Sequence, residues 1–147
     1  MILDAQSWFG AHGLDEHMPG KVNDDGDYAL ILASRQGRHD LVWLLLSEGV
    51  NPNCKDPYGN NALWAACYAD SEVCCRLLVN NACRVDYQNP AGNTALAYAA
   101  SSGKDKMVQL LLELGANPAL QNQDGMTALD LASSRASLKL LRAVRAK

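Results

Sequence analysis

Apolar residues return along this chain at a fixed interval. The dipeptide Ala-Leu stands at residues 29–30 and again at every step of 33 residues, and another alanine follows four residues after the first one each time. Leucine clusters stand further on at 44–46, 77–78 and 110–112, with polar residues between them. A period of this length indicates a repeat protein, in which each repeat buries its apolar face against its neighbours.

Each repeat is predicted to open with a β-turn and to continue with two short helices. The turn begins with Asn or Asp and ends with Gly three residues later, the residues that tight turns favour. Asn61, Thr94 and Thr127 follow the turns as N-cap residues, whose side chains accept hydrogen bonds from the first turn of a helix. The first helices are expected near 28–36, 61–69, 94–102 and 127–134. The second helices, with leucines on one buried face, are expected near 39–48, 71–81 and 105–114.

The repeat resembles the ankyrin repeat, which has a β-turn and two antiparallel helices in 33 residues. The family's signature D-x-x-G-x-T-P-L-H-x-A appears in this chain as Asn89-x-x-Gly92-x-Thr94-Ala95-Leu96-x-x-Ala99. The resemblance covers residues 23–147 and implies an all-α fold, an ankyrin-repeat solenoid of helix-turn-helix units with β-turn fingers. The family's usual Pro is Ala in all four copies, and its usual His, which bonds to the turn, is replaced by Ile31, Trp64, Ala97 or Asp130.

We expect a single domain over residues 1–147, with atypical ends. Its predicted parts are an N-terminal capping half-repeat at 1–22, full repeats at 23–55, 56–88 and 89–121, and a shortened C-terminal capping repeat at 122–147. Trp8-Phe9 stands before Gly13 as Leu110-Leu111 stands before Gly115, so a lone helix is expected over 3–12. Leu140-Leu141 lies three residues early, so the last helix is expected to be clipped.

Composition and charge narrow the class of partner. The formal net charge is −3, which argues against a general nucleic-acid binder, although five basic residues between Arg135 and Lys147 form a basic end. No apolar run is long enough to cross a bilayer, and the N-terminus lacks the features of a signal peptide. The five cysteines, an odd number, favour a reducing compartment. We therefore expect a cytoplasmic monomer that binds neither nucleic acid nor membrane.

Candidate catalytic and metal-binding residues are sparse. Cys67, Cys74 and Cys75 cluster, but each stands where other repeats carry small or apolar residues, so we expect core packing rather than a metal site. Cys83 is expected to be buried as well, whereas Cys54, in a connecting segment, is expected to be the most exposed cysteine. No nucleophile motif, phosphate loop or paired metal motif is present. We expect no enzyme activity, no cofactor and no metal.

The resemblance implies that partners dock on the turns, called fingers, and on the first helices, called the palm. The second repeat carries aromatic residues at both places and lacks two glycines that its neighbours have, and local departures of this kind mark functional sites. The predicted partner-binding residues are Asp25, Asp27, Arg35, Tyr58, Asn60, Trp64, Tyr68, Asn93, Tyr98, Ser101 and Ser102. For Trp64 and Tyr98, simple packing between first helices remains an alternative.

The function expected from these residues is a protein–protein interaction module, an adaptor or regulator that binds a protein partner through a concave palm and the fingers. The alternative is an accessory or regulatory subunit of an enzyme or toxin, or a nucleic-acid binder that uses the basic C-terminal end.

Overall fold

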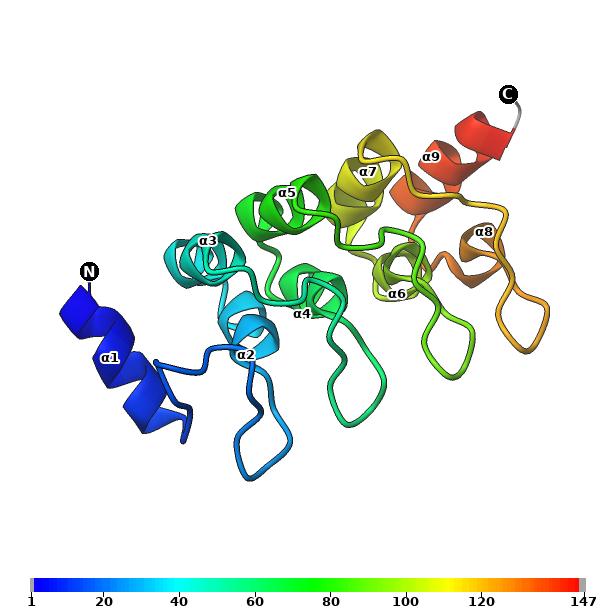
Figure 1. The fold of residues 1–147 in the computed structure, drawn as a ribbon. Coiled ribbons are helices and arrows are strands. Elements are labelled where there is room, and N and C mark those ends of the chain that lie inside the picture. Colours follow the sequence, from blue (N-terminus) through cyan, green and yellow to red (C-terminus); the bar gives the residue numbers. More distant parts are fainter. Residues whose placement is uncertain (1, 146–147) are drawn as a thin grey trace. The chain divides into compact units, whose positions relative to one another are not determined.

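The computed structural model describes residues 2–145, which form nine helices and no strand apart from one isolated antiparallel bridge between Lys55 and Asn61 (Figure 1). The all-α repeat fold predicted from the sequence is confirmed. The chain divides into two compact units, residues 1–83 (unit 1) and 84–147 (unit 2). Lys147 and the side chain of Arg145, both part of the predicted basic end, lie outside what the structure describes.

Unit 1 contains five helices: α1 (Ile2–Ala11), α2 (Ala29–Arg35), α3 (His39–Ser47), α4 (Ala62–Tyr68) and α5 (Glu72–Asn80). The first helices α2 and α4 pack against each other, and the second helices α3 and α5 do the same. Each first helix also packs on the second helix of its own repeat, so the unit has two rows of helices. The two finger turns project beyond the row that holds α2 and α4 (Figure 1).

Unit 2 contains α6 (Ala95–Ser101), α7 (Asp105–Glu113), α8 (Ala128–Leu131) and α9 (Arg135–Arg145). Its packing repeats that of unit 1, with α6 against α8 and α7 against α9.

The last repeat differs from the prediction. Helix α8 ends three residues early, because the backbone of Ala132 is extended (ψ 125°) and the N–H of Ser133 donates to the carbonyl of Ala100 at 3.1 Å. The prediction of a clipped final helix is wrong: α9 has 11 residues, more than the nine of α7, so the shortening falls on α8 and the link behind it.

Side-chain caps start the first helices where the sequence predicted them. Asn61 Oδ1 accepts from the N–H of Trp64 at 3.2 Å, and Thr94 Oγ1 accepts from the N–H of Ala97 at 3.1 Å. Thr127 forms a reciprocal capping box with Asp130. Each cap satisfies N–H groups that have no partner within the helix, which fixes where the helix begins.

Small and branched apolar side chains fill the core of each unit. Ala33, Ala66 and Ala99 are fully buried, and an alanine at this position lets first helices approach closely. The fully buried large side chains come from both helix rows: Leu30, Ile31, Leu41, Leu45, Leu63, Leu78, Leu96, Leu111 and Leu141. The leucine periodicity of the sequence is therefore the core of the structure.

The second repeat has strained helix ends. Gly49 and Gly115 end second helices with φ values of 83° and 96°, in the left-handed region that glycine adopts most readily. At the same place the second repeat has Ala82, with a φ of 73°, and Asp70 adopts a φ of 57° where the neighbouring repeats have glycine. The fold thus imposes a glycine conformation on two residues that are not glycine.

Helix α1 closes unit 1. Trp8 and Phe9 are buried, and their rings meet edge to face with centroids 5.4 Å apart. Trp8 Nε1 donates to Gln36 Oε1 at 2.7 Å, and Gln36 Nε2 lies 2.9 Å from His12 Nε2. Gln36 therefore ties α1 to the end of α2.

Candidate functional site

The fingers are held by their own first residues. Asp56 Oδ1 accepts the backbone N–H groups of Tyr58 and Asn60, both at 2.9 Å. The side chains that do the same in the other fingers are those of Asn23, Asn89 and Asn122. Because these internal bonds use backbone N–H groups, the shape of the second finger does not depend on the side chain of Tyr58 at its tip.

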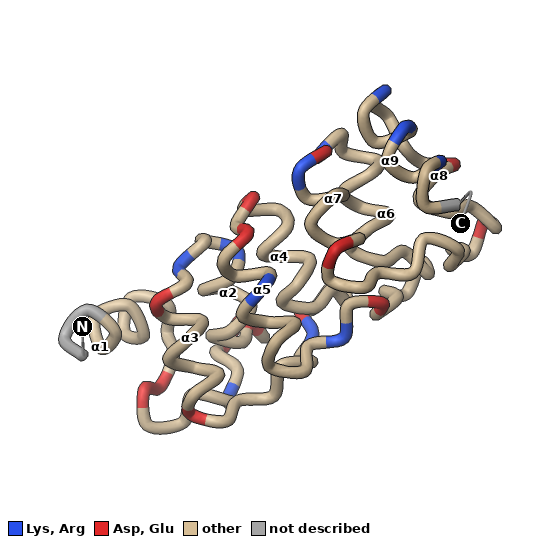
Figure 2. Tube along the Cα trace, turned by 90° about the horizontal axis from the view of Figure 1, so that it is seen from above, with Lys and Arg blue, Asp and Glu red and all other residues tan. Residues whose placement is uncertain are grey.

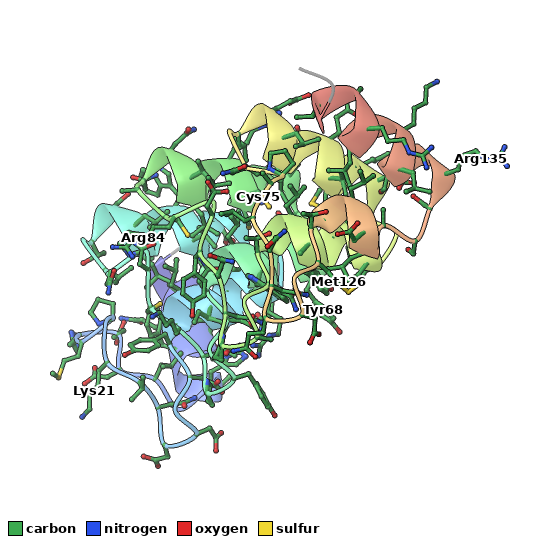
Figure 3. The ribbon with its side chains drawn as sticks, turned by 90° about the vertical axis from the view of Figure 1, so that its right-hand side faces the viewer. Lys21, Tyr68, Cys75, Arg84, Met126 and Arg135 are labelled. Carbon is green, nitrogen blue, oxygen red and sulfur yellow. The ribbon has the colours of Figure 1, made fainter. Side chains whose placement is uncertain are left out.

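In unit 1, two predicted site residues present aromatic rings to solvent. Tyr58, at the tip of the second finger, is 82% exposed, and Tyr68, at the end of α4 (Figure 3), is 63% exposed. Trp64, on α4 between them in sequence, is half-buried. The two tyrosines therefore contribute little to the core of the free protein.

The polar site residues of unit 1 differ in their exposure and contacts. Arg35 is exposed, and its guanidinium lies 3.5 Å from the largely buried carboxylate of Asp56. Asp25 is exposed, whereas Asp27 and Asn60 are half-buried. Arg35 therefore helps to hold the second finger against α2, a structural contact that the sequence did not predict.

The predicted site residues of unit 2 are less prominent. Ser101 and Ser102 are exposed, and Tyr98 is half-buried. Asn93 Oδ1 accepts from Asn122 Nδ2 at 2.9 Å, which joins the last two fingers. Asn93 thus has a structural role, and the serines are the predicted site residues of this unit with the most accessible side chains.

Helix α9 carries a separate group of cations. Arg135, Lys139 and Arg142 are exposed, recur at spacings of four and three residues, and form no ion pair with any described residue (Figure 2). Figure 3 shows Arg135 extending away from the helix. These side chains form the part of the predicted basic end that the structure describes.

The five cysteines are all free, and all are buried. This confirms the prediction for Cys67, Cys74, Cys75 and Cys83. Cys54 is the most exposed of the five, as expected, but at 8% exposed it is still buried, and it lines a small cavity with Tyr28 and Leu30. Burial, with the neighbouring Cys83 as a second cause, raises the pKa of the Cys54 thiol to about 12, and burial raises that of Cys83 to about 11.

Metal and membrane chemistry find no support in the part of the chain that the structure covers. Among residues 2–145, no three His, Cys, Asp or Glu side chains gather closely enough to hold a metal ion. None of the described helices has both the length and the apolar character needed to span a bilayer. The features that stand out are therefore surface features of the fingers and helices.

The chain consists of pairs of short helices, and finger turns join one pair to the next. With exposed aromatic and polar residues at the finger tips, this architecture defines a repeat protein built for surface contacts. A family model described as ankyrin repeats matches it in three overlapping stretches, residues 11–89, 30–122 and 74–146. The chain belongs to the ankyrin repeat family.

Two curated relatives are similar to part of the chain. They are protein phosphatase 1 regulatory subunit 12A of Mus musculus and that of Rattus norvegicus, each 32% identical over 86 residues. The match covers 58% of this chain but only 8% of each relative. Together with the family match, this similarity supports a protein-interaction or regulatory role.

Proposed function

We propose that the chain is a protein-interaction module, an adaptor or regulator, that binds a protein partner through the finger–palm surface of unit 1. This surface consists of the two finger turns and the exposed sides of α2 and α4. The observation that carries the proposal is the exposure of Tyr58, 82% at the tip of a finger. Tyrosine is one of the residues that most often dominate binding energy at protein interfaces.

A structural role does not account for this exposure. The finger is shaped by Asp56, and the Tyr58 backbone N–H that takes part would be present with any residue except proline. Tyr68 adds a second exposed ring on the palm. Trp64, which lies between the two tyrosines in the sequence, is half-buried. An aromatic centre with polar neighbours such as Asp25 is the usual anatomy of a binding hot spot.

The two relatives are named as regulatory subunits, which supports an accessory, non-catalytic part for this chain. The alternative expected from the sequence, a regulatory subunit of an enzyme, is a special case of the same proposal. A cytoplasmic location and a monomeric state are proposed as well, and five free cysteines suit a reducing compartment.

The proposal can be tested by site-directed photocrosslinking in native lysate. A photoreactive benzoylphenylalanine is placed at position 58, at position 68, or at position 43 on α3 as a control, where Trp43 is also an exposed aromatic residue. We expect one protein to crosslink at positions 58 and 68 and not at position 43. Crosslinking that occurs only from position 43 would show that the second-helix row is the binding surface.

A further inference from the structure

A cleft opens beside the aromatic surface of unit 1. Its volume is about 530 Å³. It is lined by the C-terminal end of α1, the first finger and Leu32 of α2, and the finger contributes Asp24, Asp25 and Asp27 to its wall. It is therefore an open cleft whose apolar residues are Ala11 and Leu32, and whose polar wall has three carboxylates with His12 and Asn23 beside them.

The cleft and the exposed tyrosine belong to neighbouring fingers. A Cβ added to Gly26 of the first finger would lie 3.5 Å from Pro57 Cγ of the second, so the two turns lie close together. Tyr58 directly follows Pro57, and Asp25 and Asp27 flank Gly26. An occupant of the cleft can thus reach the Tyr58 ring without leaving the surface.

The charge of unit 1 indicates the chemistry of this occupant. Residues 1–83 hold eleven acidic and five basic side chains, a formal charge of −6 on the part of the chain that carries the cleft. The three arginines of unit 1 already lie within ion-pair distance of its own acids: Arg35 with Asp56, Arg38 with Asp40, and Arg76 with Glu72. Asp24, Asp25 and Asp27 form no ion pair with any described residue.

We propose that the cleft and the adjoining ring of Tyr58 receive a segment of the protein partner that bears Lys or Arg side chains. This inference rests on the proposed function and adds the chemistry of the partner. The cation pairs with the carboxylates of the first finger, its aliphatic stem packs on Leu32, and a second cation lies over the exposed tyrosine ring. Charge complementarity of this kind speeds association and rejects acidic partners, including nucleic acid.

The first experiment asks which peptides the surface selects. The full-length chain is immobilised and panned against a phage-displayed library of random 12-residue peptides, with Tyr58→Ala used to discard peptides that bind elsewhere. We expect the retained peptides to be enriched in Lys and Arg relative to the input library. Enrichment in Asp or Glu, no charge preference, or no retained peptide would overturn the proposal.

The second experiment uses one synthetic peptide from that selection. The double variant Asp24→Asn, Asp25→Asn removes two charges and keeps the backbone bonds of the finger, because the side chain that accepts them is that of Asn23. Asp124→Asn is the matched control, since Asp124 occupies in the last finger the place of Asp25 in the first. We expect the double variant to bind at least about tenfold more weakly and with a shallower salt dependence, and the control to bind like the unmodified chain.

The outcomes separate this inference from the proposed function. If Tyr58→Ala weakens the peptide and the double variant does not, the basic partner is excluded while the finger–palm surface stands. If peptides bind the chain but every one of them also binds Tyr58→Ala in the selection, the surface itself is wrong and both proposals fail. If duplex DNA competes for the same site with a steep salt dependence, the occupant is a nucleic acid and the inference is overturned.

Discussion

Replacing Ala82 with glycine should make the protein more stable. Ala82 ends the second helix of its repeat with a φ of 73°, where Gly49 and Gly115 stand in the repeats on either side. The left-handed conformation costs an L-residue ~1–2 kcal/mol. Glycine removes this cost, but it also raises the conformational entropy of the unfolded chain, which lowers stability by ~0.4–1 kcal/mol. Because Ala82 is exposed, almost no packing is lost with its methyl group.

The net gain expected for Ala82→Gly is about 0.5–1 kcal/mol in the free energy of unfolding. Urea unfolding followed by circular dichroism measures it from the shift of the midpoint at constant slope. Gly49→Ala is the mirror control, since an added Cβ there meets no atom within 4 Å and only the backbone conformation is perturbed. It should lose a similar amount. The reasoning is refuted if Gly49→Ala destabilises the protein as expected and Ala82→Gly is neutral or destabilising.

Two further outcomes follow from single groups. The hydroxyls of Ser134 and Ser137 donate to Asp105 and hold the pKa of its carboxyl below the usual value. These bonds therefore stabilise the folded protein above pH ~4, and the stabilisation is lost as the pH falls through the lowered pKa. Asp105→Asn should lower the free energy of unfolding at pH 7 and make its loss in acid smaller, which unfolding measured at several pH values would show. Cys54 should react with a thiol reagent at pH 8 only after unfolding, because burial and a pKa of about 12 leave almost no accessible thiolate, and rapid labelling of the native protein would contradict that.

The repeat and its helices could be predicted because the same local signals occur several times. Asn61 and Thr94 cap their helices as their position after each turn indicates, and Gly49 ends its helix in the expected conformation. Because the signal recurs every 33 residues, each repeat can be compared with the others. An exception such as Ala82 is therefore visible in the sequence alone.

Contacts that depend on tertiary structure could not be predicted in this way. Cys54 lies among Asn, Pro and Lys residues, which suggest an exposed segment, and only the fold brings it against Tyr28 and Leu30. The bond from Trp8 to Gln36 joins residues 28 apart, and the later repeats have leucine in the place of Trp8, a side chain that cannot donate such a bond.

The candidate site could be predicted from the sequence only in outline. The gathering of Tyr58, Trp64 and Tyr68 in one repeat is visible without a structure, but their exposure is not: two rings face solvent, and Trp64 is half-buried. The ion pair of Arg35 with Asp56 was also hidden, since Asp56 stands where the other repeats have asparagine and nothing in its own repeat indicates a partner.

The most direct test of the central claim is the affinity of the crosslinked protein partner for three alanine variants. Tyr58→Ala and Tyr68→Ala should each leave the unfolding midpoint almost unchanged, because both rings are mostly exposed in the free protein. Each should weaken the partner by about 30-fold, the equivalent of the ~2 kcal/mol that defines a hot spot. Trp43→Ala, which removes an aromatic ring 55% exposed on α3, should bind as the unmodified chain does. Loss of binding in Trp43→Ala, with full affinity in both tyrosine variants, would contradict the assignment of the fingers and first helices as the binding surface.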